Sequence, residues 1–199
     1  MSQKIIETER LIIRPFILDD LLVIHRILDQ TIGDGSKVDD EAAIVERRSW
    51  LAWSILSQEW LPKMGQFPYG DRGITLKSTG ILIGATGYVP LLDVYDQIPE
   101  LRSGTVPSKY SLPEVGLFWA VDPSYQRRGY ASEAAQGLIE YGFQQLRLKR
   151  ILATTEYKNL ASQAVMQKVG MKMTRNPLPT PPWLQVVGVM ENSETESVA

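Results

Sequence analysis

Residues 121–134 have the sequence Val121-Asp122-Pro123-Ser124-Tyr125-Gln126-Arg127-Arg128-Gly129-Tyr130-Ala131-Ser132-Glu133-Ala134. Ahead of this stretch, apolar side chains alternate along 114–121, which predicts a β-strand. After it, small and apolar residues recur at helical spacing: Ala131, Ala134, Leu138, Ile139 and Gly142. The stretch is therefore predicted to be a tight polar turn that joins a strand to a helix.

This turn has the chemistry of a phosphate-binding loop. The start of a helix exposes unpaired backbone N–H groups and the positive end of the helix dipole. Gly129 lets the backbone approach a ligand closely, and Arg127 and Arg128 add two positive charges. A pyrophosphate is the ligand that such a turn suits best. An ordinary turn between a strand and a helix is the alternative.

Residues 126–131 resemble the Q/R-x-x-G-x-G/A pattern of the GCN5-related N-acetyltransferase (GNAT) superfamily. In that family this loop holds the pyrophosphate of acetyl-CoA. A pattern with one fixed glycine is weak evidence by itself, so the rest of the chain decides between the family and a chance match.

Two further matches lie far from the loop in sequence. Residues 8–16, followed by Asp19-Asp20-Leu21, resemble the opening of the RimJ/RimL branch of the superfamily. That branch acetylates protein N-terminal amines, although many relatives modify other amines. Asn159, Ser162 and Gly170 match a third RimJ/RimL pattern, but Met171 replaces the phenylalanine that follows the glycine. Together the matches cover most of residues 8–171.

The resemblance implies an α+β (α/β) GNAT fold. We expect a central, mostly antiparallel, mixed and twisted sheet of about six to seven strands, flanked by about four helices. Residues 1–199 form a single N-acetyltransferase domain in this interpretation. Residues 91–112 are longer than a hairpin connection and are expected to be an inserted loop, either a surface excursion or a lid near the acceptor. Residues 191–199 are expected to be a disordered tail.

Composition excludes several classes of site and protein. The 199 residues include no cysteine and one histidine, His25, which argues against disulfides, a cysteine nucleophile, a Ser–His–Asp triad and a metal site. We expect a cytoplasmic protein without a membrane partner, because no apolar run is long enough to span a bilayer and Met1-Ser2-Gln3-Lys4 shows no signal-peptide pattern.

The charge distribution favours one small phosphorylated ligand. Residues 122–175 hold nine Lys or Arg and four Asp or Glu, whereas the whole chain has a net charge of -2. A basic segment in an acidic protein argues against general nucleic-acid binding. Solvated helix faces are the simpler explanation of the same charges.

The resemblance assigns acetyl-CoA as co-substrate and a set of residues that hold it. Backbone N–H groups of the loop would bind the pyrophosphate, and the backbone of Trp119 and Val121 would pair with the pantetheine. Asn159 would contact the pantetheine or cap a helix. The full cofactor-binding set is Trp119, Val121, Gln126, Arg127, Arg128, Gly129, Tyr130, Ala131, Asn159 and Ser162.

Two side chains are candidates for proton transfer. Glu114, at the start of the central strand, is the candidate base, because many relatives use a glutamate on this strand to deprotonate the amine through water. The alternative, with equal weight, is that Glu114 is a structural carboxylate. Tyr69, Asp71 and Tyr88 are weaker candidates for the base. Ser162 is the candidate acid for the departing thiolate. Met166 stands where many relatives place a donating tyrosine, which leaves Ser162 or Tyr157.

The predicted function is transfer of acetyl from acetyl-CoA to a primary amine by direct attack, through a tetrahedral intermediate. The acceptor is a protein N-terminus or a small-molecule amine. The alternative is a non-catalytic, regulatory acyl-CoA-binding module, which would need neither Glu114 nor Ser162. A Rossmann oxidoreductase is excluded because no G-x-G-x-x-G follows the first strand. The oligomeric state is open, with a homodimer as one alternative.

Overall fold

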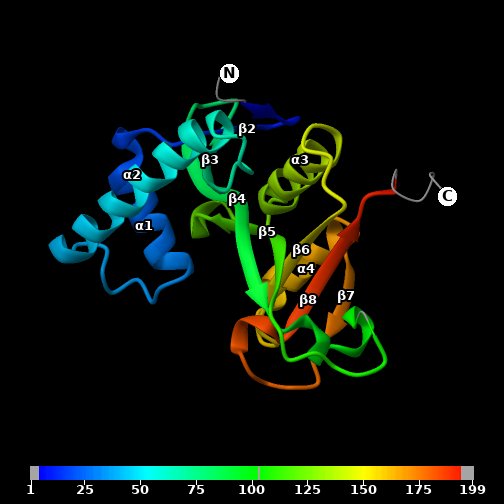
Figure 1. The fold of residues 1–199 in the computed structure, drawn as a ribbon. Helices are drawn as coiled ribbons and strands as arrows, with labels where there is room; N and C mark the ends of the chain where they lie inside the picture. Colours follow the sequence, from blue (N-terminus) through cyan, green and yellow to red (C-terminus); the bar gives the residue numbers. More distant parts are fainter. Residues whose placement is uncertain (1–4, 103, 194–199) are drawn as a thin grey trace. The chain divides into compact units, whose positions relative to one another are not determined.

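The computed structural model describes residues 5–102 and 104–193 (Figure 1). Its four α-helices are α1 (Leu21–Thr31), α2 (Glu41–Lys63), α3 (Tyr130–Gln144) and α4 (Leu160–Lys168). Its eight strands are β1 (Ile6–Glu7), β2 (Leu11–Arg14), β3 (Gly70–Leu76), β4 (Leu82–Asp93), β5 (Leu112–Val121), β6 (Arg150–Thr155), β7 (Lys172–Arg175) and β8 (Val186–Glu191). None of the described helices is both long and apolar enough to cross a membrane.

The strands hydrogen-bond in the order β1-β2-β3-β4-β5-β6-β8-β7, which confirms the predicted α+β GNAT fold with four helices. Most neighbours are antiparallel, and β5 and β6 are parallel. The sheet has eight strands where six to seven were expected. The short strands β1 and β7 were not predicted, because two and four residues give too little alternation to identify a strand.

Contacts divide the chain into two compact units. The first unit comprises Met1–Val89 and Phe118–Leu138, and the second comprises Pro90–Leu117 and Ile139–Ala199. Strands β4 and β5 and helix α3 each contribute residues to both units. The single acetyltransferase domain stays a prediction.

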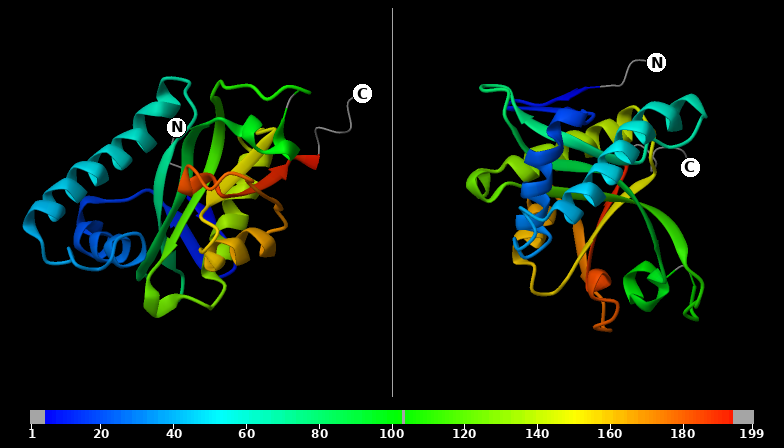
Figure 2. Two further views of the ribbon diagram at one scale, coloured as in Figure 1. Left: turned by 90° about the horizontal axis from the view of Figure 1, so that it is seen from below. Right: turned by 90° about the vertical axis from the view of Figure 1, so that its left-hand side faces the viewer.

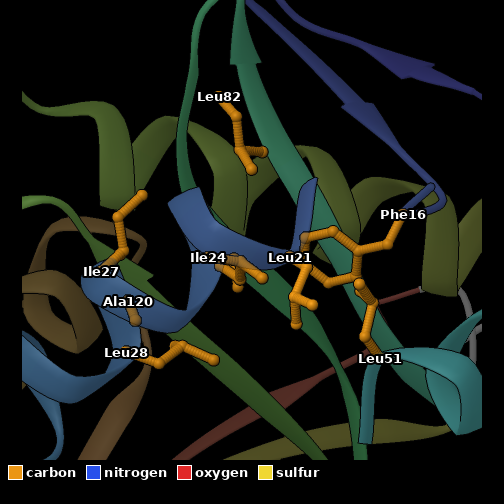
Figure 3. Packing of buried hydrophobic residues seen from close by; sticks show 9 residues of the cluster. Phe16, Leu21, Ile24, Ile27, Leu28, Leu51, Leu82 and Ala120 are labelled. Carbon is orange, nitrogen blue, oxygen red and sulfur yellow. The ribbon is translucent and has the colours of Figure 1, made fainter. Parts of the chain in front are cut away.

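In the first unit, the strands present different residues to the helices on their two faces. A side chain at Gly73 of β3 would meet Phe16 and Leu82, which belong to a cluster with α1 and α2 (Figure 3). On the other face, the Tyr88 hydroxyl donates to the carbonyl of Leu138 on α3, at 2.5 Å. Alternation therefore assigns Gly73 and its neighbours two residues away to the face of α1 and α2.

The α1 and α2 face is held by an apolar cluster. Figure 3 shows Leu21, Ile24, Ile27 and Leu28 of α1 packed with Leu51 of α2, and Figure 2 shows the two helices running beside each other. These four α1 residues lie at i, i+3, i+6 and i+7, as the amphipathic pattern predicts.

Helix α2 begins after Asp40 and not after its neighbour Asp39. Asp40 is the N-cap, and its side chain accepts from the backbone N–H groups of Ala42 and Ala43. Both carboxylates suit a helix start equally well in sequence, so local sequence does not choose between them.

In the second unit, β8 lies between β6 and β7 and is antiparallel to both. The expected inserted loop, 91–112, contains regular structure. β4 continues to Asp93, and two short 3-10 helices follow at Tyr95–Gln97 and Pro99–Leu101. Tyr95 and Ile98 are buried in an apolar cluster with Leu152, Leu184, Val187 and Val189. The part of this stretch around Tyr95 and Ile98 therefore belongs to the core of its unit. Ser103 lies outside the described residues.

The first residues of the expected tail, Glu191 and Asn192, are part of the fold, which corrects the predicted boundary. Glu191 is the last residue of β8, and Asn192 is buried, with its side chain donating to the carbonyl of Leu148 at 3.0 Å. Residues 194–199 lie outside the described part of the chain.

Candidate active site

The loop between β5 and α3 presents a run of backbone donors. Within the described chain, the N–H groups of residues 127–132 make no hydrogen bond. Arg127 and Gly129 have positive φ angles of 60° and 82°. A non-glycine residue at positive φ costs energy and is most often found at functional sites. Consecutive N–H groups in such a loop, at the start of a helix, form an anion-binding concavity.

The beginning of the loop is fixed by side chains that face inward. Asp122 accepts from the N–H of Ser124 at 2.8 Å and from Arg26 Nη2 at 2.7 Å. Burial raises the pKa of Asp122, but these hydrogen bonds and the Arg26 charge outweigh it and hold the pKa below its ordinary value. Gln126 Nε2 donates to the carbonyl of Val121 at 2.9 Å. The Gln126 side chain thus closes the turn, and its backbone remains the predicted contact for acetyl-CoA.

The end of the loop is held by an ion pair between Arg10 and Glu133. Arg10 Nε lies 2.6 Å from Glu133 Oε2, and Arg10 Nη1 donates to the carbonyl of Arg128 at 3.0 Å. Glu133 Oε1 accepts from Thr8 Oγ1 at 2.5 Å and from the N–H of Arg10 at 2.7 Å. Burial raises the pKa of Glu133, but these hydrogen bonds outweigh it and lower the value overall.

The predicted pantetheine-binding residues lie on the last part of β5. The Asp122 N–H donates to the carbonyl of Ile83 at 2.8 Å, and Thr86 Oγ1 donates to the carbonyl of Phe118 at 2.7 Å. Since backbone groups of successive residues point to opposite edges of a strand, those of Trp119 and Val121 point away from β4. Pairing with an extended ligand on that edge stays a prediction.

In the second unit, Glu114 is bound by an arginine. Arg150 Nε donates to Glu114 Oε2 at 3.0 Å, and Arg150 Nη2 contacts Oε1. The hydrogen bond to Glu114 raises the pKa of Arg150. Both carboxylate oxygens are thus engaged, which supports the structural alternative for Glu114 over the base.

Asn159 and Ser162 lie at the start of α4. Asn159 is the N-cap, as one of its two predicted roles required, and its Oδ1 accepts from the N–H of Ser162 at 3.1 Å. Ser162 is half-buried, and its hydroxyl makes no hydrogen bond within the described chain. The hydroxyl is therefore available for a ligand.

The two other residues considered for the acid are engaged elsewhere. Met166 is fully buried, and a side chain at Gly188 of β8 would lie 3.2 Å from its sulfur. The Tyr157 hydroxyl donates to the carbonyl of Asn176. Ser162 is thus the better placed of the predicted donors. The described residues contain no cluster of three or more His, Cys, Asp or Glu side chains that would hold a metal ion.

Comparison with known proteins decides the family. Residues 10–172 match the family model described as an acetyltransferase (GNAT) domain. The chain belongs to the GNAT acetyltransferase family. This GNAT protein is 32% identical over 177 residues to the uncharacterized N-acetyltransferase YjdG of Bacillus subtilis. The matched region covers 83% of the chain and 98% of YjdG. A shorter stretch of 59 residues is 51% identical to the uncharacterized N-acetyltransferase YnaD of the same organism, but it spans 30% of the chain and 34% of YnaD.

Solved structures show the same fold. A GNAT-family acetyltransferase from Bacillus anthracis superposes with a TM-score of 0.62 at 23% identity, covering 95% of this chain and 99% of that one. RimL, a ribosomal L7/L12 alpha-N-protein acetyltransferase in complex with coenzyme A, superposes with a TM-score of 0.60 at 15% identity, covering 94% and 96%. These likenesses support the fold of this GNAT protein and leave its acceptor open.

Sequence reasoning missed the side chains that brace the loop: Thr8, Arg10, Arg26, Asp122 and Glu133. Thr8 and Arg10 belong to the RimJ/RimL-like opening, whose residues were not assigned to the loop. The only sequence signal was that this opening and the loop both match the family, although they are more than 100 residues apart.

Proposed function

We propose that this protein is an acetyl-CoA-dependent N-acetyltransferase that transfers acetyl to a primary amine by direct attack, through a tetrahedral intermediate. The supporting observation is the run of six backbone N–H groups at 127–132 that have no partner among the described residues. The run lies at the start of α3 and includes Arg127 and Arg128. A pyrophosphate has the charge and the acceptor oxygens that such a run requires. Acetyl-CoA supplies the pyrophosphate and the acetyl thioester.

Ser162 and Asn159 of the second unit keep their predicted roles as proposals, and Glu114 is assigned its structural alternative. Ser162 donates a proton to the departing thiolate, and Asn159 orients the Ser162 backbone through its cap. Glu114 is proposed to position Arg150, because the guanidinium engages both of its oxygens.

The acceptor is proposed to be a peptide or small-molecule primary amine. RimL is described as a protein acetyltransferase of ribosomal L7/L12. A relative from Aspergillus fumigatus, 30% identical over 79 residues, is described as an FsC-acetyl coenzyme A-N(2)-transacetylase. Both descriptions name transfer to nitrogen, and they differ in acceptor.

Thermal unfolding with and without acetyl-CoA tests the cofactor assignment, with NAD and ATP as control ligands. A ligand at about 100 times its Kd stabilises the folded state by roughly 2.7 kcal/mol. Selective stabilisation by acetyl-CoA is expected, and Gly129→Glu should abolish it by adding bulk and negative charge to the loop. No shift in folded protein would reduce the loop to an ordinary turn.

Thiol release distinguishes the enzyme from the non-catalytic alternative. An enzyme releases free CoA from acetyl-CoA when a suitable amine is present. A regulatory module binds acetyl-CoA with the same stabilisation and releases no thiol with any amine.

A further inference from the structure

Asp71 is a buried carboxylate on the face of the first unit that α1 and α2 cover. It lies two residues before Gly73 on β3 and pairs with Gly87 of β4. A Cβ at Gly87 would lie 2.7 Å from Asp71 Oδ1 and 2.5 Å from the carbonyl oxygen of Gly70. The absent side chain at Gly87 therefore provides the space that the carboxylate occupies.

The carboxylate has an oxygen without a partner. Asp71 is 9% exposed, and its Oδ1 is buried with no hydrogen bond. An unsatisfied buried carboxylate oxygen destabilises the folded state. A bound ligand and a catalytic role are two explanations for retaining such a group.

Helix α2 contributes further unsatisfied polar atoms. Arg47 Nε, Ser54 Oγ and Gln58 Oε1 are buried without a hydrogen bond in the described chain. Their spacings of seven and four residues place them on one face of α2. Gln58 Nε2 donates to the carbonyl of Gly70, the residue before Asp71, at 3.0 Å. Arg47 Nε is a donor, whereas Ser54 Oγ and Gln58 Oε1 are unfilled acceptors that a ligand N–H group at the interface between α2 and β3 would satisfy.

Asp71 is not part of a structural ion pair. The charge of Arg47 acts on Asp71, but Arg47 makes no ion pair with it in the described chain and lies over the Trp50 ring at 5.0 Å. Burial raises the pKa of Asp71 to about 6, although the Arg47 charge acts in the opposite direction. The β4 residues on the same face, Ala85 and Gly87, carry no charge.

We propose that Asp71 is the general base, which removes a proton from the acceptor's ammonium group between α2 and β3. The N–H bond breaks, and the proton passes to a carboxylate oxygen of Asp71. The freed lone pair attacks the acetyl carbonyl carbon and forms the tetrahedral intermediate, whose nitrogen still carries one proton more than the amide product. As the C–S bond breaks, the nitrogen loses this proton, which balances the proton that the departing thiolate takes up to become a thiol. This inference rests on the proposed acetyltransferase function and names the acceptor as a cationic primary amine.

The basicity of Asp71 suits this role better than that of an ordinary carboxylate. A base with a pKa of about 6 is mostly ionised at pH 7 and still accepts protons more readily than a surface aspartate. Glu114, by contrast, has Arg150 on both oxygens.

The test compares wild type with Asp71→Asn by thiol release, using three primary amines: a dipeptide with a free N-terminus, Nα-acetyl-lysine and spermidine. Asp39→Asn, an exposed carboxylate next to the cap of α2, is the matched control. Loss of a general base is expected to lower kcat about 100-fold at pH 7. The affinity for acetyl-CoA, measured by thermal shift, should stay within about 3-fold. The loss should shrink at pH 9, where more of the amine is already neutral.

The wild-type pH–rate profile keeps the test decisive if Asp71→Asn does not fold. An increase in kcat as the pH rises through about 6 supports Asp71 as the general base. A profile set only by the amine's own pKa, between about 8 and 10, overturns it. A raised KM for the amine with unchanged kcat also overturns the base.

The two proposals fail in different ways. If wild type releases thiol and Asp71→Asn matches it at every pH, the base is wrong and the acetyltransferase stands. If wild type neither binds acetyl-CoA nor releases thiol with any of the three amines, both proposals are wrong.

Discussion

Glu114 and Arg150 form a two-point ion pair on neighbouring parallel strands of the second unit. Glu114 lies near the start of β5 and Arg150 at the start of β6, and Gly116 pairs with Leu152 two residues further along both strands. The Glu114 side chain is 11% exposed and that of Arg150 is 35% exposed. A bidentate pair in this setting fixes the relative positions of two strands more firmly than a surface pair does.

We therefore predict that Glu114→Gln affects stability more than chemistry. The variant should lose on the order of 1 kcal/mol of unfolding free energy, because it removes a charge-assisted pair, and should keep kcat within about 3-fold. A double-mutant cycle with Arg150→Gln, followed by urea unfolding, measures the coupling. A fall in kcat of about 100-fold with unchanged stability would instead restore Glu114 as the base.

Asp71 gives a second prediction, in the pH dependence of stability. Its pKa is about 6 in the folded protein and 3.8 when unperturbed. The folded state therefore binds the proton more tightly. The contribution of Asp71 to stability is fully present below pH 3.8 and is lost as the pH rises through 6.

Relative to Asp71→Asn, wild type should lose about 2 kcal/mol of unfolding free energy between pH 4 and 7. This is most of the roughly 3 kcal/mol to which the whole pKa difference corresponds at 1.36 kcal/mol for each pKa unit. Urea unfolding of both proteins at several pH values measures the difference directly. Groups common to both proteins cancel in this comparison. A difference that stays constant over this range would show that the pKa of Asp71 is not raised.

The ion pair between Arg10 and Glu133 predicts a third effect. Glu133→Gln keeps the shape of the side chain but replaces one acceptor oxygen with an N–H₂ group that faces the donors of Arg10. Because Arg10 also donates to the carbonyl of Arg128, the loop should lose its fixed geometry. We expect the Kd for acetyl-CoA to rise about 10-fold, roughly 1.4 kcal/mol.

Isothermal titration with acetyl-CoA checks this prediction. Glu46→Gln, an exposed glutamate of α2 in the same unit, is the matched control for the loss of one charge. Equal affinities for the two variants would mean that the Arg10–Glu133 pair does not organise the loop.

Much of the fold follows from local sequence. The amphipathic pattern of α1, the alternation along β5 and the Asn159 cap of α4 each involve residues within about ten positions of one another. Such signals need no tertiary contact to be recognised. The family patterns then specified how these elements combine.

The burial of Asp71 and the pairing of Glu114 could not be predicted in this way. Asp71 lies in a strand whose seven residues are all buried, so alternation does not show which side chain lacks a partner. Arg150 is 36 residues from Glu114, and Glu133 is 123 residues from Arg10. Contacts at such separations depend on how strands and helices assemble, which single-sequence patterns do not encode.

Ser162 gives the last prediction, which concerns the proton that the thiolate receives. Ser162→Ala should lower kcat by about 10- to 100-fold, since the leaving group then departs without a general acid. The affinity for acetyl-CoA should change little, because Asn159 bonds the backbone N–H of residue 162 rather than its hydroxyl. Steady-state thiol release and thermal shift measure the two quantities on the same protein.

Met166→Tyr tests whether a phenol can replace the lost hydroxyl. Met166 is fully buried against Gly188 and Met171, so a tyrosine there would overpack the second unit and cost about 1–3 kcal/mol. The double variant of Ser162→Ala and Met166→Tyr should therefore be less stable than Ser162→Ala and no faster. Recovery of kcat in the double variant would show that residue 166 reaches the reacting atoms. An unaltered kcat in Ser162→Ala alone would remove Ser162 as the acid and leave its hydroxyl without a role in proton transfer.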